Sequence, residues 1–355
     1  MPFYYHLRRK IPDKHERSIV INKLLHLRKR LDIDVPAKNL DQDLLLATWN
    51  IRDFDKDNRR GFGERLPESL FYIAEILSRF DFVAVQEVNQ LGEWETVMDI
   101  LGPDFDWIAT DVTDNSLGGN GERLTYLWDR RKVHFQNIAG EIVLPDKFLI
   151  DKKKQFRRTP FVASFQSGWF KFDICTVHIY YGEDTGPALG QRIQEIDVVA
   201  KYFGERADLG LKGDRALILL GDFNVISPQH KTMKALLDNG FTVPKGLQEP
   251  TNVIGTKYYD QIVFKTKPKV IEYAEKDGNA GVFKLFRSAF ANGQVDDYKA
   301  AMAKASGLKK GKKYKGDFAR FYKDWRTYQL SDHNPLWVRL SVNESEAYLK
   351  SLKEA

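Results

Sequence analysis

Residues 216–224, Ala-Leu-Ile-Leu-Leu-Gly-Asp-Phe-Asn, decide the fold of this chain. Five apolar residues in a row are typical of a buried β-strand, and the run stops at Gly221. Alternate side chains of an extended strand point the same way, so Asp222 and Asn224 would share one site while Phe223 anchors the opposite side. Gly, Asp and Asn are also common turn residues, so this stretch alone does not exclude an ordinary turn.

Five other stretches repeat the arrangement of a short apolar run that carries chemically capable side chains at or near one end. Turn chemistry alone does not explain so many repeats, and the pattern predicts strands whose ends build one polar site. The stretches are 44–49 followed by Asn50-Ile51-Arg52, 82–85 followed by Gln86-Glu87-Val88, 172–177 followed by His178, 258–264 with Asp260 inside, and Ser331-Asp332-His333-Asn334-Pro335 followed by 336–340.

Taken in this order, the motifs resemble those of the endonuclease/exonuclease/phosphatase superfamily of metal-dependent phosphoesterases, and most closely its deoxyribonuclease I branch. They extend from residue 44 to about residue 340. Glu122-Arg123 and Arg158-Thr159-Pro160, each before a short apolar run, are two further matches to that branch. The resemblance implies an α/β fold, a four-layered αββα sandwich of two mixed β-sheets flanked by helices.

The resemblance also implies a metal site and contacts to phosphate. Mg²⁺ prefers oxygen ligands and takes one or two carboxylates, and Mn²⁺ can substitute for it. Glu87, Asp332 and Asn50 would hold the metal or one of its waters. Arg158 would hold a phosphate oxygen with its planar fork, and Arg52 would contact the DNA backbone or form a surface salt bridge.

Two histidines would supply acid and base catalysis. His333 would pair with Asp260, and His178 would pair with Glu122 in the manner of the deoxyribonuclease I branch. The residues leave open which histidine is the base and which is the acid. Two neighbouring side chains would orient the attacking water and hydrogen-bond the phosphate, namely Asp222 and Asn224.

The substrate is narrowed by elimination to DNA. The inositol phosphatase branch expects Pro-x-Trp-Cys-Asp-Arg where residues 257–261 read Lys-Tyr-Tyr-Asp-Gln, and the exonuclease III type usually has Tyr in place of His178. Gln261 replaces an Arg that is common in the deoxyribonuclease I branch, which changes the expected contacts to the DNA backbone. Two alternatives stay open: a phosphatase or phosphodiesterase for an inositol phosphate or a phospholipid, and a DNA-binding protein with a decayed site.

Composition indicates a soluble enzyme of a reducing compartment, so we expect a cytoplasmic monomer. Cys175 is the only cysteine among 355 residues, and an intrachain disulfide is therefore impossible. No apolar run approaches the roughly 20 residues that a membrane span needs. The start of the chain is basic but lacks the apolar segment of a secretory signal.

Charge divides the chain into an acidic body and two basic attachments, residues 1–40 with a net charge of +6 and residues 265–326 with +9, which leaves −9 for the rest. An acidic body can hold a cation while separate basic surfaces attract a polyanion. The predicted units are a basic amphipathic extension over 1–42, a catalytic domain over 43–345 with an insertion at about 265–326, and a tail over 346–355.

The insertion is expected to act as a nucleic-acid clamp or lid, with a merely solubilising loop as the alternative. Its basic cluster would contact phosphates. Helical patterns are predicted at 14–31, 66–80, 94–101, 189–204 and 229–239, and in the insertion at 282–292 and 296–305. The lysines of the cluster are Lys309, Lys310, Lys312 and Lys313.

Overall fold

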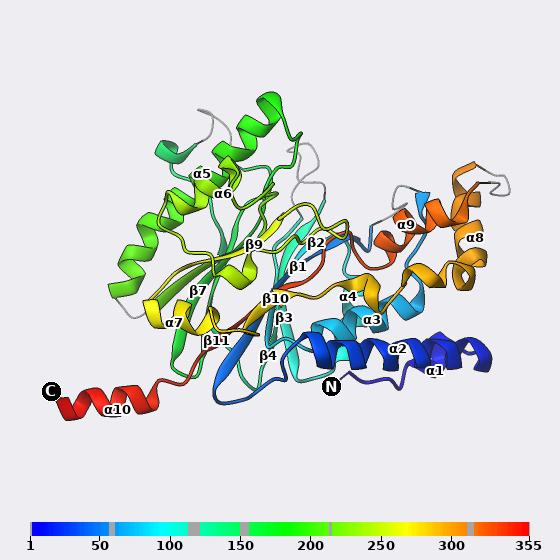
Figure 1. Ribbon diagram of the computed structural model, residues 1–355, viewed down its shortest axis with the longest axis horizontal. Coiled ribbons are helices and arrows are strands. Elements are labelled where there is room, and N and C mark those ends of the chain that lie inside the picture. Colours follow the sequence, from blue (N-terminus) through cyan, green and yellow to red (C-terminus); the bar gives the residue numbers. More distant parts are fainter. Residues whose placement is uncertain are drawn as a thin grey trace.

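Two β-sheets pack face to face and helices cover both outer faces, so the chain is a four-layered αββα sandwich (Figure 1). The computed structural model describes residues 2–56, 61–112, 121–149, 156–212, 215–310 and 316–354. The first sheet has the strand order β10-β11-β1-β2-β4-β3 and the second β5-β6-β7-β8-β9. Each sheet holds one parallel pair, β1 with β2 and β7 with β8, among antiparallel pairs. The predicted sandwich of two mixed sheets is confirmed.

The predicted strands are present, and the edge strands β3, β5 and β10 come in addition. The first sheet contains β1 (Asp43–Phe54), β2 (Phe82–Val88), β3 (Phe105–Ala109), β4 (Arg123–Asp129), β10 (Ala280–Val282) and β11 (Leu336–Ser341). The second contains β5 (His134–Glu141), β6 (Phe161–Ser167), β7 (Phe170–His178), β8 (Arg215–Asp222) and β9 (Asp260–Lys265).

Helices form at six of the seven stretches where the apolar spacing predicts them, and some begin at a side-chain cap. α2 begins after Asp13, whose side chain accepts a hydrogen bond from the backbone N–H of Glu16 at 2.8 Å. None of the helices in the described ranges is both long and apolar enough to cross a membrane. The helices are α1 (Leu7–Lys10), α2 (Lys14–Asp34), α3 (Pro67–Leu77), α4 (Gly92–Leu101), α5 (Gly186–Lys212), α6 (Lys231–Leu237), α7 (Pro268–Ala274), α8 (Lys299–Lys310), α9 (Phe318–Gln329) and α10 (Ser345–Glu354).

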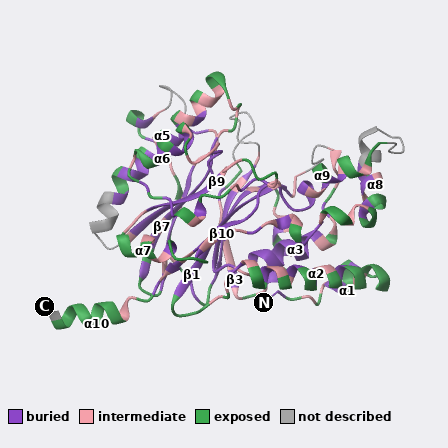
Figure 2. Ribbon diagram, viewed as in Figure 1, coloured by how far each residue is buried: buried purple, intermediate pink, exposed green. Residues whose placement is uncertain are grey.

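The space between the two sheets is filled by aromatic rings. Phe82 of β2 meets Phe165 of β6 edge to face, with the ring centroids 4.8 Å apart. Tyr126 of β4 donates to the carbonyl oxygen of Phe161 at 2.7 Å and accepts from the backbone N–H of Thr176 at 2.8 Å. These contacts fix the offset between the sheets, and the central strands of both sheets are almost wholly buried, whereas the edge strand β5 is largely exposed (Figure 2).

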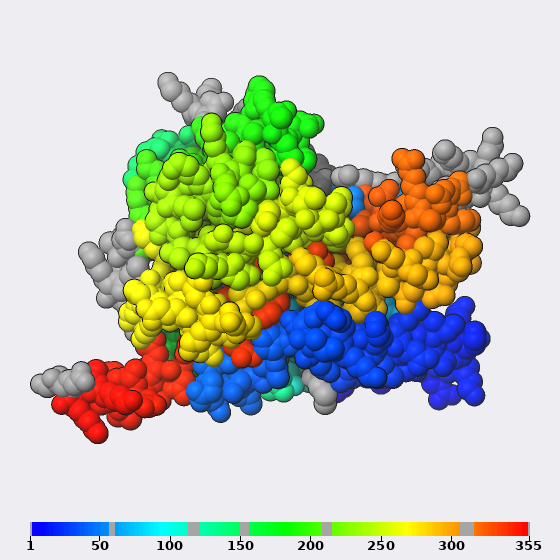
Figure 3. Space-filling model, viewed as in Figure 1, coloured from blue at the N-terminus to red at the C-terminus, as the bar shows by residue number. Residues whose placement is uncertain are grey.

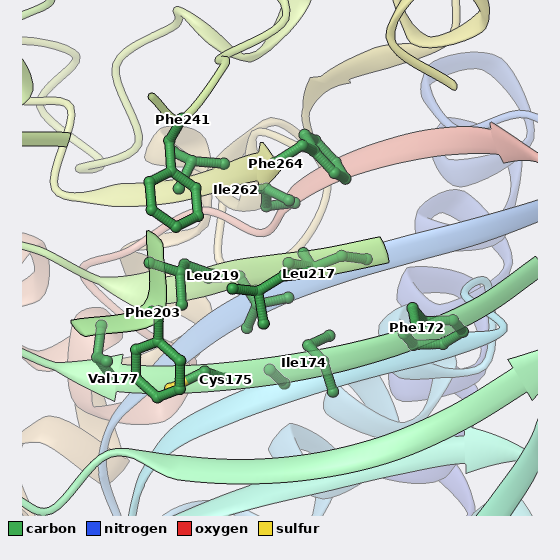
Figure 4. Packing of buried hydrophobic residues seen from close by; sticks show 14 of the residues in the cluster. Phe172, Ile174, Cys175, Val177, Phe203, Leu217, Leu219, Phe241, Ile262 and Phe264 are labelled. Carbon is green, nitrogen blue, oxygen red and sulfur yellow. The ribbon is translucent and has the colours of Figure 1, made fainter. Parts of the chain in front are cut away.

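Helix α5 covers the outer face of the second sheet. Side chains of β7 alternate between the two faces, so Phe172 and Ile174 point away from Cys175 and Val177. Figure 4 shows Cys175 and Val177 on the same side of the strand as Phe203 of α5. Burial raises the pKa of the Cys175 thiol well above its ordinary value, so this cysteine serves packing.

Residues 265–326, predicted as an insertion, contribute one strand, β10, to the first sheet. β10 pairs with β11 at the edge of the first sheet, and the chain from about residue 283 to the end of α9 lies beside α2 and α3 (Figures 1 and 3). The helix predicted at 282–292 is wrong, because a single turn of 3-10 helix at Leu285–Arg287 replaces it. Buried apolar side chains in this segment, such as Phe283 and Phe290, pack into the core rather than along a helix stripe.

Helix α2 of the N-terminal extension packs against helix α3 of the catalytic domain. Leu24, Leu27 and Leu31 are buried along one stripe of α2, as the spacing predicts. Ile19 of the same helix is 38% exposed. Lys23 donates to Tyr298 Oη at 2.9 Å, so the extension also touches the segment before α8.

Candidate active site

The register of the second sheet places three predicted residues side by side. His178 on β7 lies opposite Asp222 on β8, and Asp222 lies opposite Asp260 on β9. Residues in register across a sheet point to the same face, so the three side chains meet at one end of the sheet. Asn50 of β1 joins them from the first sheet, since its Nδ2 donates to Asp222 Oδ2 at 3.1 Å and to Glu87 Oε1 at 2.9 Å. The strand ends of both sheets therefore build one site.

His333 and Asp260 form the first histidine–carboxylate pair. His333 Nδ1 lies 2.7 Å from Asp260 Oδ2, and the other ring nitrogen faces Asp222 Oδ2 at 3.8 Å. Burial would lower the pKa of His333, but the negative charges of Asp260 and Asp222 hold it well above its ordinary value. Trp49 Nε1 fixes the backbone by donating to the His333 carbonyl oxygen at 2.9 Å.

His178 and Glu122 form the second pair. His178 Nδ1 lies 2.5 Å from Glu122 Oε1, and Nε2 faces Asp222 Oδ2 at 3.5 Å. Arg158 forms an ion pair with the same carboxylate oxygen of Glu122. Burial and the charge of Arg158 would lower the pKa of His178, but the carboxylates of Glu122 and Asp222 raise it overall. Both pairs therefore converge on one oxygen of Asp222.

Glu87 occupies the end of β2 in a left-handed backbone conformation, with φ of 64°. Such a conformation is uncommon outside glycine and clusters at functional sites. Its Oε2 accepts from the backbone N–H of Asp53 at 2.7 Å. Burial would raise the pKa of Glu87, but the positive charge of His178 and the hydrogen bonds from Asp53 and Asn50 lower it to about 2. Glu87 is therefore ionised at neutral pH.

Asn224 adopts a second left-handed conformation, with φ of 53°. Its Nδ2 donates to the carbonyl oxygen of Ile179 at 2.8 Å, and its backbone N–H donates to Asp222 Oδ1 at 2.9 Å. Asn224 thus closes a small loop that keeps Asp222 Oδ2 turned toward the two histidines. The sequence pattern placed both residues at the site, but only the structure supplies this mutual support.

Asp332 forms an ion pair with Arg52, whose Nη1 lies 3.2 Å from Asp332 Oδ2. Arg52 also donates to Thr327 Oγ1 at 2.6 Å and to Tyr328 Oη at 2.9 Å, both at the end of α9. The predicted alternatives for Arg52 were a DNA contact and a surface salt bridge. In the structure it links α9 to Asp332, so the segment beyond β10 reaches the site through this arginine.

The basic cluster of the predicted insertion is only partly described. Lys309 and Lys310 end helix α8. The other two predicted lysines, Lys312 and Lys313, lie outside the described residues.

Comparisons with known proteins agree with this fold. A structure of an endonuclease/exonuclease/phosphatase family protein from Bacteroides thetaiotaomicron aligns over 85% of this chain and 95% of its own, with a TM-score of 0.53 at 18% identity. This chain has the endonuclease/exonuclease/phosphatase fold. A mannosyl-6-phosphatase from Bacteroides thetaiotaomicron VPI-5482 aligns over 84% and 99%, with a TM-score of 0.52 at 18% identity. The human Nocturnin catalytic domain with bound sulfate aligns over 84% and 94%, with a TM-score of 0.50 at 12% identity.

The chain is also similar in sequence to one curated protein. A deoxyribonuclease from Thioalkalivibrio sp. (strain K90mix) is 30% identical over 219 residues, which make up 58% of this chain and 54% of the relative. The match therefore spans about half of the relative's length. No family model matches the chain.

The donor set of this site suits a hard divalent cation. Two groups each place three ligand atoms within 4.8 Å of one another, Glu87 with Glu122 and His178, and Asp222 with Asp260 and His333. Asn50 Oδ1 is buried without a hydrogen-bond partner among the described residues, directly beside Glu87. A buried oxygen without a partner next to an ionised carboxylate fits a cation or one of its waters. The residues present therefore fit a divalent cation.

Two functional residues on α5 escaped sequence reasoning. Arg192 and Glu195 are charged residues, yet they are fully or almost fully buried, because they lie on the face of α5 that packs against the second sheet. Charged residues are rarely buried unless they are paired, so their position on an apolar helical stripe was the available signal. Arg192 Nη1 donates to the carbonyl oxygen of Asn224 at 3.1 Å, which ties α5 to the site.

Proposed function

We propose that this chain is a divalent-metal-dependent phosphodiesterase, an endonuclease that hydrolyses DNA by in-line attack of water. The observation that carries the proposal is the convergence of two histidine–carboxylate pairs on Asp222 Oδ2, with His178 Nε2 at 3.5 Å and His333 Nε2 at 3.8 Å. Hydrolysis of a phosphodiester needs one group to take a proton from water and another to protonate the leaving oxygen. Two oriented histidines at one carboxylate meet that need.

The residues divide the work according to their contacts. Asp260 Oδ2 lies 2.7 Å from His333 Nδ1 and Glu122 Oε1 lies 2.5 Å from His178 Nδ1, so these carboxylates would fix the two tautomers and leave Nε2 for the reaction. Asp222 lies between the two Nε2 atoms and orients the attacking water. One histidine accepts the proton of that water, and the other returns a proton to the leaving oxygen.

The phosphate is held by positive charge and by a cation. Glu87 and Asn50 would hold Mg²⁺, with Asp332 as a further ligand once Arg52 turns to the substrate. When bound, the ion neutralises charge on the phosphoryl oxygens. Arg158, paired with Glu122 beside His178, would hold a phosphate oxygen.

DNA is the proposed substrate for two reasons. A relative with 30% identity over the matched region is a deoxyribonuclease. The chain also carries two basic segments outside an acidic catalytic body, which suits a long polyanion better than a small phosphate ester. Lys309, Lys310, Lys312 and Lys313 are proposed to contact the DNA backbone.

The test is a cleavage assay in which four candidate substrates are incubated separately with the protein. Supercoiled plasmid, a sugar phosphate, an inositol phosphate and sphingomyelin are each incubated with the protein and Mg²⁺ or Mn²⁺. We expect nicked plasmid, no cleavage in EDTA, and loss of cleavage in His333→Ala. Asp222→Asn should nearly abolish turnover while metal and DNA binding persist. Turnover of the sugar phosphate, inositol phosphate or lipid with intact plasmid would replace the proposal with a phosphatase or lipid phosphodiesterase.

A further inference from the structure

An aromatic surface adjoins the catalytic histidines. The chain leaves His178 and continues through Tyr180 and Tyr181, and Tyr181 is 42% exposed. Arg157 lies over the ring of Tyr180, with the guanidinium carbon 3.8 Å from the ring centroid. We call Arg157, Tyr180 and Tyr181 the tyrosine ledge. None of the three has a part in the chemistry described above.

The ledge lies one aromatic ring away from the reacting groups. Tyr259 makes an edge contact with Tyr181, with the centroids 5.9 Å apart, and its ring also lies 5.5 Å from that of His333. Asn224 Nδ2 donates to the carbonyl oxygen of Ile179, the residue just before the ledge. A substrate whose phosphate lies between the histidines would therefore bring its neighbouring groups over the ledge.

Helix α5 holds the ledge from below with two buried charged side chains. Glu195 Oε2 accepts from the backbone N–H of Tyr180 at 2.9 Å. Arg192 Nε donates to the carbonyl oxygen of Tyr181 at 2.8 Å, and its guanidinium carbon lies 4.6 Å from the centroid of the Tyr181 ring. One face of Tyr181 is thus covered by a fixed cation, and its exposed part is held in a set position.

The backbone beyond the ledge is equally constrained. Gly182 has φ of 60°, and a Cβ at this position would lie 2.6 Å from a ring carbon of Tyr180. Only glycine fits such a turn without moving the ring. A surface that is rigid before its ligand arrives loses little entropy on binding, which is the usual design of a specificity site.

We propose that the tyrosine ledge stacks an unpaired nucleobase next to the scissile phosphate, so that the enzyme acts on DNA with single-stranded character at the cleavage site. Every base offers a π-face, and an exposed tyrosine with an arginine close by is the arrangement that single-strand-binding proteins use. A base paired within a duplex is stacked on its neighbours and offers no free face to Tyr181. This inference rests on the proposed function and adds the form of the substrate.

The test measures binding in EDTA, so that no cleavage occurs. Fluorescence anisotropy follows a short labelled single-stranded oligodeoxynucleotide, the same sequence as a duplex, and a backbone of the same length in which every base is missing. Tyr181→Leu should weaken binding of the normal single strand about tenfold and leave the abasic strand unchanged. Tyr181→Phe keeps the ring and should bind as the wild type does.

Tyr348→Leu is the matched control, because Tyr348 is 51% exposed on α10, away from the site. It should bind all three nucleic acids normally. Equal weakening of normal and abasic strands by Tyr181→Leu, or tighter binding of the duplex than of the single strand, overturns the ledge. Plasmid cleavage by the wild type is recorded separately with Mg²⁺. If the wild type cleaves and binds DNA but Tyr181→Leu does not selectively weaken binding of the normal single strand, only the ledge fails. If the wild type neither binds nor cleaves DNA, the proposed function fails together with the ledge.

Discussion

Arg192→Met should destabilise the protein and disable the site together. The guanidinium of Arg192 is fully buried and donates to three backbone carbonyl oxygens, those of Tyr181, Glu183 and Asn224, and to the Asp184 carboxylate. Met has a similar length and no donors, so these acceptors lose their partner. The change therefore isolates the hydrogen bonds from the packing.

The magnitude follows from the burial of each acceptor. A buried acceptor left without a donor costs about 1–3 kcal/mol. Tyr181 and Glu183 lie on an exposed loop and can turn to water, whereas Asn224 is 4% exposed and cannot. Asp184 keeps its ion pair with Lys257 at 2.5 Å. The Asn224 carbonyl loses its donor completely, and the other acceptors lose theirs only in part. We therefore expect the free energy of unfolding to fall by about 3 kcal/mol.

The catalytic effect comes from displacement of Asn224 and Asp222. A misplacement of about 1 Å at a reacting group lowers turnover about 100-fold. The assays are urea unfolding for stability and plasmid nicking for turnover. Arg192→Lys should recover part of both, since an ammonium still donates. Arg215→Met is the control, because Arg215 is partly exposed and, among the described residues, forms its ion pair with the partly exposed Asp173, so the change should cost less than about 1 kcal/mol. An Arg192→Met protein with wild-type urea midpoint and turnover refutes the role of α5 as the support of the site.

Two further predictions concern buried carboxylates. Asp260→Asn should lower turnover about 100-fold or more in the plasmid assay, because an amide neither fixes the Nδ1 proton nor stabilises the protonated ring of His333; turnover within twofold of wild type would contradict the pairing. Asp129 is buried, and although burial raises its pKa, Arg131 and Lys38 lower the pKa overall. Its ionised form therefore stabilises the fold above the unfolded-state pKa of about 4, and this contribution is lost as pH falls. Asp129→Asn should lower the free energy of unfolding by about 2 kcal/mol at pH 7 and by less at pH 3, as urea titrations will show; an equal loss at both pH values would exclude this origin.

Most strands of the sandwich were readable from the sequence because their signals are local. An apolar run such as 216–220 with polar residues at its end is a strand whatever packs on it. The additional strands β3, β5 and β10 gave weaker signals, because they are short or exposed at a sheet edge; β5, for example, has no buried residue. The helix expected at 282–292 failed for a related reason, since its apolar residues fill a core from an irregular backbone.

The segment around α9 shows how tertiary structure adds to a site. Its charge suggested a basic attachment, and the structure instead directs Thr327 and Tyr328 to Arg52. That contact joins residues about 275 positions apart in the chain. Local propensity carries no information about such a pair, because it depends on how α9 packs against the first sheet.

The sequence by itself determined which residues end the strands, because side-chain alternation and turn residues act within a few positions. It therefore placed Asp222, Asn224 and His178 at strand ends before any fold was known. Only the tertiary structure decided what lies beneath them, above all the two buried charges of α5, Arg192 and Glu195. Burying those charges is favourable only when loops from several strands bring hydrogen-bond partners to the same place, and that is a property of the assembled sandwich.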